Sequence, residues 1–271
     1  MEKLLPVVAG VDIGSITAKA VIMDGGQRVL AYSVVNQGLV NEEAAQNSLA
    51  EAIVRAGISR EDISTIVTTG YGRDLVKFGN RSITEITCHA AGAHHLRPEI
   101  RTIVDVGGQD SKVIALDDRG RVATFRMNDK CAAGTGRFLE VMARALGVEL
   151  ADFGRIALQS QNPAPVSSFC AVFAESEVVS LAAKGYPKID IIGGIHQAIA
   201  RRLSSMVRAV GLREPVAMTG GVAKNEGAVR ALEQALGVEI VLHPEPQIVG
   251  ALGAALFALR SSAASNGAAV R

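Results

Sequence analysis

The chain has 271 residues, of which 48% are hydrophobic, 4% aromatic and 20% charged, and its formal net charge is +1 at pH 7. This length allows one large domain or two lobes, and a charge near zero without a basic stripe argues against binding of nucleic acid. No apolar run approaches the roughly 20 residues that cross a bilayer, so no membrane association is expected.

The chain contains three cysteines, an odd number that argues against a disulfide framework. Its N-terminus enters a strand pattern at once and lacks the layout of a signal peptide. We therefore expect a cytoplasmic protein with reduced thiols.

A sequence repeat starts near the N-terminus: residues 11–24, VDIGSITAKAVIMD, match residues 104–117, VDVGGQDSKVIALD, at an offset of 93 residues. The matched pairs are Asp12 with Asp105, Gly14 with Gly107, Lys19 with Lys112 and Asp24 with Asp117. Each copy has the pattern of an apolar strand, a tight polar turn and a second apolar strand, and a third strand follows at 28–35 and 121–127. A repeat of this size predicts two related lobes rather than a solenoid.

The two repeated turns have the composition of phosphate-binding loops. Glycine lets the backbone approach a ligand closely, and bare backbone N–H groups attract anions. The carboxylates of Asp12 and Asp105, each at the end of a buried strand, are suited to Mg²⁺, held directly or through water. The alternative is a pair of ordinary glycine hairpins, with Lys19 and Lys112 as paired surface lysines.

The rest of the chain alternates helical and strand patterns. Helices are predicted at 42–57, 83–96, 135–147, 149–158, 173–185, 191–211, 226–236 and 248–259, and strands at 63–70, 216–219 and, with a turn, 238–247. Gly220 and Gly221 stand between a strand and a helix, which is typical of nucleotide contacts and equally of plain βα turns.

We divide the chain into four segments by their expected roles. They are 1–100 with the first phosphate loop, 101–190 with the second loop and a cluster-binding segment, 191–262 with the adenosine-binding part and the C-terminal helix, and 263–271 as a flexible tail. The division between the lobes is expected between the helix from 135 and the helix near 190.

Five motifs carry a family resemblance: NDKCAAGTGRFLEVMA, TGYGR, VDVGGQDSKV, CAVFAESEV and MTGGVAKN. They resemble the ATP-dependent activators of 2-hydroxyacyl-CoA dehydratases and the related benzoyl-CoA reductase subunits, the BadF/BadG/BcrA/BcrD-type ATPases, from about residue 7 to residue 258. The resemblance implies an α/β, two-lobed, duplicated actin/Hsp70/sugar-kinase-like (ribonuclease H-like) fold with the nucleotide in the cleft between the lobes. It also implies an ATP-hydrolysing iron–sulfur reductase that passes a low-potential electron from ferredoxin or flavodoxin to an iron–sulfur dehydratase or reductase.

Cys131 and Cys170 each precede a helical stretch, and the partial positive charge of a helix N-terminus favours a thiolate. Two thiolates cannot complete a four-thiolate iron–sulfur site, whereas two chains around a twofold axis can. The resemblance implies this arrangement: one [4Fe-4S] cluster per homodimer, with Cys131 and Cys170 as the ligands from each chain. From the residues alone, small buried hydrophobes, a Zn²⁺ site or a catalytic thiol stay open. Cys88, in the stretch CHAAGAHH, is expected to pack in the core rather than bind a metal.

The matched motifs also imply roles for individual residues. ATP or ADP would be bound by Asp12, Gly14, Ser15, Ile16, Thr17, Ala18, Lys19, Gly107, Gly108, Gly134, Thr135, Gly220, Gly221 and Gln247. The catalytic residues would be Asp105, Gln109 and Asp110, with Gln109 or Asp110 near the attacking water and Asp12 and Asp105 organising Mg²⁺. The loop from Cys131 to Gly136 would connect ATP hydrolysis to the redox centre.

Three other functions are compatible with parts of the pattern. A small-molecule kinase of the same superfamily would need a sugar or acid pocket with a catalytic base. A non-catalytic ATP-dependent chaperone or regulator would need a peptide-binding domain, for which the sequence offers no segment. A reductase of a double-cubane-cluster protein would share the redox chemistry and differ in its partner.

Overall fold

The computed structural model describes residues 6–38, 40–167 and 170–268, and the chain forms two compact units. The first unit is Met1–Glu99, Asp118–Val122 and Gln247–Arg271, and the second is Ile100–Asp117 and Ala123–Pro246. The expected division between residues 135 and 190 is wrong. It is wrong because the C-terminal helix α8 (Val249–Ala268) returns to the sheet of the first unit, where it contacts β1, β2 and β4.

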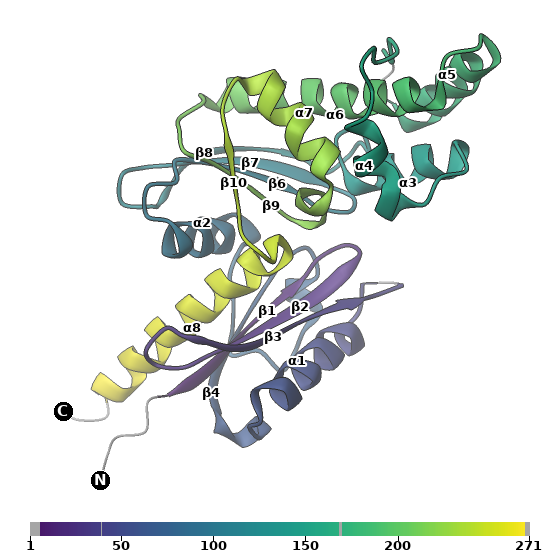
Figure 1. Cartoon of the computed structure of the whole chain (residues 1–271). Coiled ribbons are helices and arrows are strands. Elements are labelled where there is room, and N and C mark those ends of the chain that lie inside the picture. The colour runs from purple at the N-terminus through teal and green to yellow at the C-terminus, as the bar shows by residue number, and fades with distance from the viewer. Residues whose placement is uncertain (1–5, 39, 168–169, 269–271) are drawn as a thin grey trace. The chain divides into compact units, whose positions relative to one another are not determined.

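The first unit is built on a five-stranded sheet of order β3-β2-β1-β4-β5. Its strands are β1 (Val7–Ile13), β2 (Thr17–Met23), β3 (Val29–Asn36), β4 (Ile63–Thr69) and β5 (Arg81–Ser82). Helix α1 (Glu42–Ala56) packs on one face, where alternate β1 side chains such as Val11 and Ile13 point. Helix α8, with α2 (Glu85–Leu96) beside it, covers the other face, to which Val8 points (Figure 1).

The second unit has a sheet of order β10-β9-β6-β7-β8. Its strands are β6 (Thr102–Val106), β7 (Ser111–Leu116), β8 (Val122–Asn128), β9 (Val216–Thr219) and β10 (Ile240–Leu242). Its helices are α3 (Gly136–Ala145), α4 (Leu150–Ala157), α5 (Ala171–Ala183), α6 (Lys188–Val210) and α7 (Glu226–Leu236). Its core joins strands β6, β7 and β9 to all five helices, with Phe138 and Phe153 among the largest fully buried side chains.

Short 3₁₀ turns complete the chain at Arg60–Asp62 (η1), Arg73–Leu75 (η2), Gly221–Lys224 (η3) and Pro246–Ile248 (η4). Helix α8 extends through much of the segment 263–271 that was predicted to be a flexible tail, and residues 269–271 lie outside the described residues. Every helix in the described part of the chain is too short or too polar to cross a lipid bilayer.

The sequence repeat is also a structural repeat. Strands β1 and β2 form an antiparallel hairpin in which Asp12 is opposite Lys19, and β6 and β7 form one in which Asp105 is opposite Lys112. A parallel strand lies beside each hairpin: Thr69 of β4 is opposite Asp12, and Thr219 of β9 is opposite Asp105. The predicted duplication is therefore confirmed in strand order and in register.

Candidate functional site

The first hairpin turn, residues 14–16, follows a buried ion pair. Asp12 and Lys19 are 4% and 8% exposed, and Lys19 Nζ lies 3.0 Å from Asp12 Oδ2. The Gly14 N–H donates to the Thr17 carbonyl (3.0 Å), which closes the turn. Because Lys19 is buried and paired, its interpretation as a surface lysine is wrong.

The second hairpin turn, residues 107–110, repeats this arrangement with one more carboxylate. Lys112, 5% exposed, has its Nζ 3.3 Å from Asp105 Oδ2 and 2.7 Å from Asp110 Oδ2. The Gly107 N–H donates to the Asp110 carbonyl (2.9 Å). One ammonium group therefore compensates two carboxylates, while the Gln109 side chain at the tip of the turn is exposed.

A Thr-Gly step, Thr69-Gly70 or Thr219-Gly220, completes the surroundings of each aspartate. Gly220 was predicted to contact the nucleotide, whereas Thr69, Gly70 and Thr219 had no role predicted from the sequence. Gly70 and Gly220 have φ of +94° and +86°, and a Cβ atom would lie 2.3 Å from Asp12 Oδ1 at Gly70 and 2.9 Å from Asp105 Oδ1 at Gly220. Only glycine combines this backbone conformation with such a close approach. Thr219 Oγ1 also donates to Asp105 Oδ1 (2.8 Å). The sequence signal that could have indicated these residues is the Thr that ends β4 and β9, followed in each case by Gly.

The thiol loop, residues 129–135, links β8 to α3 and contains Cys131. Asn128, at the end of β8, donates through Nδ2 to the carbonyls of Cys131 (2.9 Å) and Ala133 (3.0 Å). Thr135 is the N-cap residue of α3, so Cys131 lies before the helix and not at its N-terminus as predicted. Gly134 has φ of +79°, a conformation that interrupts helical backbone and explains the late start of α3.

Two backbone hydrogen bonds tie the first residues of α3, directly after the thiol loop, to the second hairpin turn. The Gly136 N–H donates to the Gly107 carbonyl (2.9 Å), and the Arg137 N–H donates to the Gly108 carbonyl (2.7 Å). A Cβ atom at Gly136 would lie 3.2 Å from the Gly107 oxygen and 3.3 Å from Gly108 Cα, so there is little room for a larger residue. A displacement of the turn must therefore stretch these bonds or move the end of the thiol loop with it.

Cys170 is the N-cap residue of α5, which agrees with its predicted position at the start of a helix. Its side chain is exposed. Cys131 is half-buried, and helix α3, which follows it, packs against α5. Both thiols are free of disulfide bonds.

Cys88 is fully buried on α2 in the core beneath α8, as expected for a packing residue. Burial raises the pKa of its thiol to about 12, so Cys88 stays protonated at neutral pH. Within the described residues, no group of three or more His, Cys, Asp or Glu side chains is arranged to hold a metal ion.

The predicted nucleoside contacts fall in both units. Gly220 donates its N–H to the Pro246 carbonyl (3.0 Å), and Gly221 is exposed at the start of η3 in the second unit. Gln247 is half-buried in η4 and belongs to the first unit. Gly107 and Gly108 accept hydrogen bonds from Gly136 and Arg137, the first residues of α3, and Cys131, Gly134 and Thr135 lie in the loop that precedes this helix, all within the second unit.

The repeated hairpin sheets with their covering helices define a two-lobe fold of the actin/Hsp70/sugar-kinase class. A ROK family glucokinase from Streptomyces griseus shares this fold with a TM-score of 0.56 at 12% identity, over 94% of this chain and 99% of its own. Residues 9–258 match the BadF/BadG/BcrA/BcrD ATPase family, and the chain belongs to that family.

Two curated relatives illustrate the match. The 2-hydroxyisocaproyl-CoA dehydratase activator of Clostridioides difficile is 45% identical over 249 residues, which cover 92% of this chain and 93% of the relative. The (R)-2-hydroxyglutaryl-CoA dehydratase activating ATPase of Acidaminococcus fermentans is 44% identical over 255 residues, or 94% and 97% of the two chains. A solved structure of the Clostridium difficile activator with bound ADPNP has a TM-score of 0.91 at 43% identity, covering 96% of this chain and 97% of that one.

The buried pair of Asp105 and Lys112 predicts a specific pattern of stabilities. Lys112→Met removes the cation from beside two carboxylates and is expected to lower the free energy of unfolding by about 3 kcal/mol. Adding Asp105→Asn removes one of the two carboxylates that Lys112→Met leaves without a cation. The double variant should therefore recover part of the lost free energy of unfolding. Urea denaturation measures both, with the exposed Lys184→Met as the matched control. Losses that simply add in the double variant would contradict the pairing.

The three thiols differ in solvent exposure, and this difference predicts their reactivity. In iron-free, reduced protein at pH 8, iodoacetamide should modify Cys131 and Cys170, whereas Cys88 should react only after denaturation, because its thiol is buried and protonated. Peptide mass spectrometry measures each site. Modification of Cys88 in the folded protein at a rate similar to that of Cys170 would contradict this assignment.

Proposed function

We propose that this protein is an ATP-hydrolysing activator that delivers a low-potential electron to a 2-hydroxyacyl-CoA dehydratase or a related iron–sulfur reductase. The observation that carries the proposal is the pair of hydrogen bonds from Gly136 and Arg137 to the second hairpin turn. They join the helix that directly follows a cysteine-bearing loop to a turn with the composition of a phosphate-binding loop, and a small-molecule kinase has no need for such a link. Membership of an ATPase family and relatives that activate dehydratases support the same function.

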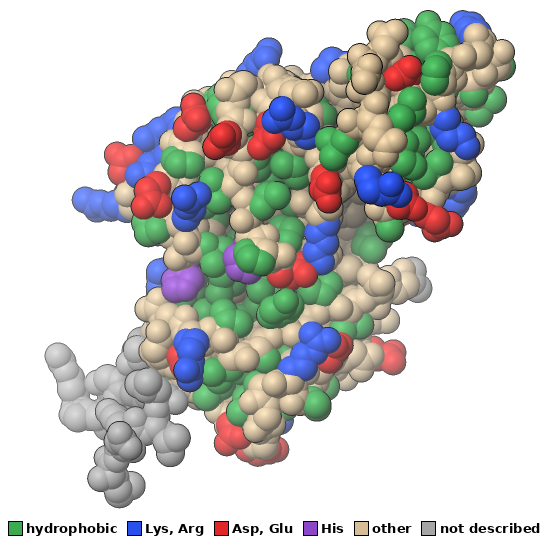
Figure 2. Space-filling view, viewed as in Figure 1, with side chains coloured by type: hydrophobic (Ala, Val, Ile, Leu, Met, Phe, Trp, Pro, Cys, Tyr) green, Lys and Arg blue, Asp and Glu red, His purple; other side chains and the backbone are tan. Residues whose placement is uncertain are grey.

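The two exposed or half-exposed thiols fit an iron–sulfur cluster only if a second chain takes part. One chain offers Cys131 and Cys170, which is half of a four-thiolate donor set. Helix α5, which Cys170 caps, carries the apolar side chains of Val172, Phe173 and Val179, which are 69%, 69% and 57% exposed (Figure 2). Exposed apolar surface of this kind marks interfaces, and a twofold homodimer formed there would bring four cysteines to one [4Fe-4S] cluster.

When bound, the cluster supplies one-electron transfer at a potential that hydrogen bonds and solvent exposure set. The residues of this chain control both factors. Asn128 donates to the carbonyls of Cys131 and Ala133 within the thiol loop, and Thr135 is fully buried and donates its hydroxyl to the Ala132 carbonyl (2.6 Å). These bonds hold the thiol loop between the end of β8 and the start of α3, and we propose that Cys131 moves with α3 when the second hairpin turn moves.

For ATP hydrolysis, we assign phosphate binding to the backbone N–H groups of the two hairpin turns, with Ser15 and Thr17 half-buried in and beside the first. Asp12 and Asp105 would organise Mg²⁺, most simply through water, because each already has a lysine ammonium at hydrogen-bond distance. Gln109 is the stronger candidate for orienting the attacking water, because its side chain is exposed whereas Asp110 is held by Lys112.

The partners follow from this chemistry. We assign a reduced ferredoxin or flavodoxin as the electron donor, because both carry one electron at low potential, and an iron–sulfur dehydratase or reductase in the cytoplasm as the acceptor. Coupling requires that the nucleotide states differ in conformation and in affinity for the acceptor.

The ligand assignment is tested by iron content after anaerobic purification. Wild-type protein should contain about two iron atoms per chain, as one four-iron cluster shared by two chains requires. Cys131→Ala and Cys170→Ala should each lose the iron and the dimer that depends on it, while Cys88→Ala should retain both. Iron-free wild-type protein, or iron retained by both Cys131→Ala and Cys170→Ala, would overturn the proposal.

The coupling is tested by the rate at which a chelator removes iron. Wild-type protein should lose iron at different rates with ADP and with a non-hydrolysable ATP analogue. Asn128→Asp replaces a donor with an acceptor beside two carbonyls, so iron loss should become several-fold faster and depend less on the nucleotide. The exposed Asn162→Asp is the matched control. Equal rates in both nucleotide states of the wild type would refute the coupling.

A further inference from the structure

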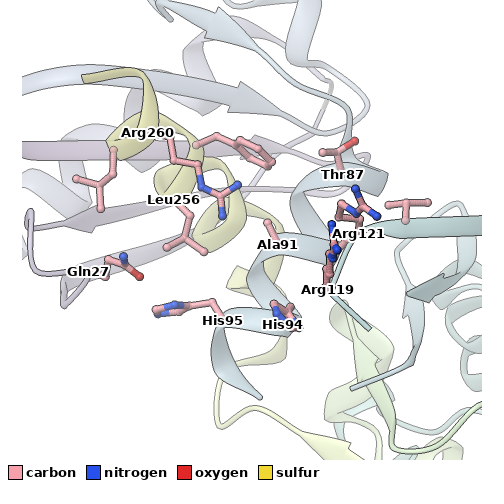
Figure 3. Close-up of a pocket in the computed structure, with 14 residues that line it drawn as sticks. Gln27, Thr87, Ala91, His94, His95, Arg119, Arg121, Leu256 and Arg260 are labelled. Carbon is pink, nitrogen blue, oxygen red and sulfur yellow. The ribbon is translucent and has the colours of Figure 1, made fainter. Parts of the chain in front are cut away.

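A pocket lies wholly within the first unit, apart from the residues assigned to ATP. Its volume is about 370 Å³, and α2, α8, Gln27 in the β2–β3 turn and residues 119–122 of the β7–β8 turn line it (Figure 3). These last residues interrupt the second unit in sequence but belong to the first. None of the lining residues has a role in the proposed ATPase.

The polar side chains of this pocket are cationic or neutral. Arg119, Arg121 and Arg260 come from two different segments, with His94 and His95 from a third, and no aspartate or glutamate is among the lining residues (Figure 3). Guanidinium groups present planar N–H donors that match carboxylate and phosphate oxygens. The pocket therefore favours a negatively charged ligand.

The remaining lining is apolar and shaped by α2 and α8. Ala90 and Ala91 of α2 leave space that larger residues would fill, and Leu256, Phe257 and Leu259 of α8 supply hydrophobic surface. The Arg260 guanidinium carbon lies 5.1 Å from the centre of the Phe257 ring, which places a cation and an aromatic surface side by side. A ligand with only a charged group would leave this surface without a contact.

One wall of the pocket is built from backbone. Gly120 has φ of +72°, and a Cβ atom there would lie 2.2 Å from His94 Cγ, so the turn packs directly on the imidazole ring. His94 Nδ1 is buried and, in the described structure, has no hydrogen-bond partner. A buried polar atom without a partner costs free energy, and such atoms are rare enough in folded proteins that each one calls for an explanation.

We propose that this pocket binds a small organic anion: a carboxylate or phosphate group attached to an apolar body. The arginines and Gln27 would contact the charged group, while α2 and α8 contact the body. The volume lies at the lower end of the range typical of small-molecule sites, which limits the ligand to a compact acid or organic phosphate. This site is separate from the nucleotide and would take a ligand whether or not ATP is bound.

The experiment is calorimetric titration of the full chain with a non-hydrolysable ATP analogue present, so that the hairpin turns are occupied. The probes are phenyl phosphate and phenylacetate, which have charge and body, inorganic phosphate, which has charge only, and benzyl alcohol, which has body only. We expect phenyl phosphate or phenylacetate to bind about tenfold more tightly than inorganic phosphate or benzyl alcohol. The tighter binder of the two shows whether the natural ligand is an organic phosphate or a carboxylic acid.

Two variants locate the binding. Arg260→Gln removes an exposed cation and Ala91→Leu reduces the space, and each should weaken binding about tenfold. The matched control is Arg55→Gln, an exposed arginine on α1 at the opposite face of the sheet. No binding of either organic anion at ~10 mM, inorganic phosphate binding as tightly as they do, or both pocket variants binding like the control would overturn the proposal.

Discussion

Two backbone hydrogen bonds, from Gly136 and Arg137 to the carbonyls of Gly107 and Gly108, connect the second hairpin turn to the helix that follows the thiol loop. They belong to the first residues of α3, whose N–H groups have no partner inside the helix. In many nucleotide-binding folds such groups bind phosphate directly. Here they bind the carbonyls of the second hairpin turn, so the helix and the cysteine loop before it are held by that turn.

The duplicated hairpins share one arrangement of buried charges. In both copies an aspartate ends a buried strand, a lysine on the next strand neutralises it, and a Thr-Gly step closes around it. Burying these charges without partners would cost several kcal/mol, so each pair fixes the register of its hairpin as well as the local charge. The second copy differs in Asp110, which engages the same lysine, so that one ammonium group compensates two carboxylates.

Much of the fold and of the repeated hairpins could be predicted from the sequence, and the predictions that were wrong or missing have physical causes. The repeat was visible because strand alternation and the Asp–Lys spacing survive in both copies. Gly220 was assigned to the nucleotide, but the contact of the Thr-Gly steps with the aspartates was missed, because two residues at the end of a strand are too short a signal without the sheet that places them opposite the aspartates. The lobe division was misplaced because α8 joins the first unit through contacts distant in sequence, which no local pattern reports.

Cys131 and Cys170 also show how far a local sequence pattern can place a residue. Cys170 could be placed at a helix start because an uninterrupted helical pattern follows it, whereas Gly134 and the Thr135 cap delay α3 beyond the reach of Cys131. A donor set completed by another copy of the chain cannot be read from one copy. Family resemblance pointed to it, and the free thiols and exposed apolar face of α5 are compatible with it.

The central claim is that the second hairpin turn and the thiol loop respond to the nucleotide as one element. Hydrogen–deuterium exchange of the iron-loaded protein tests it most directly, with ADP and with a non-hydrolysable ATP analogue. The account predicts that exchange changes between the two states in peptides covering both residues 107–110 and residues 129–137, with α1 unchanged as the internal control. A change at 107–110 that leaves 129–137 unaffected would contradict it.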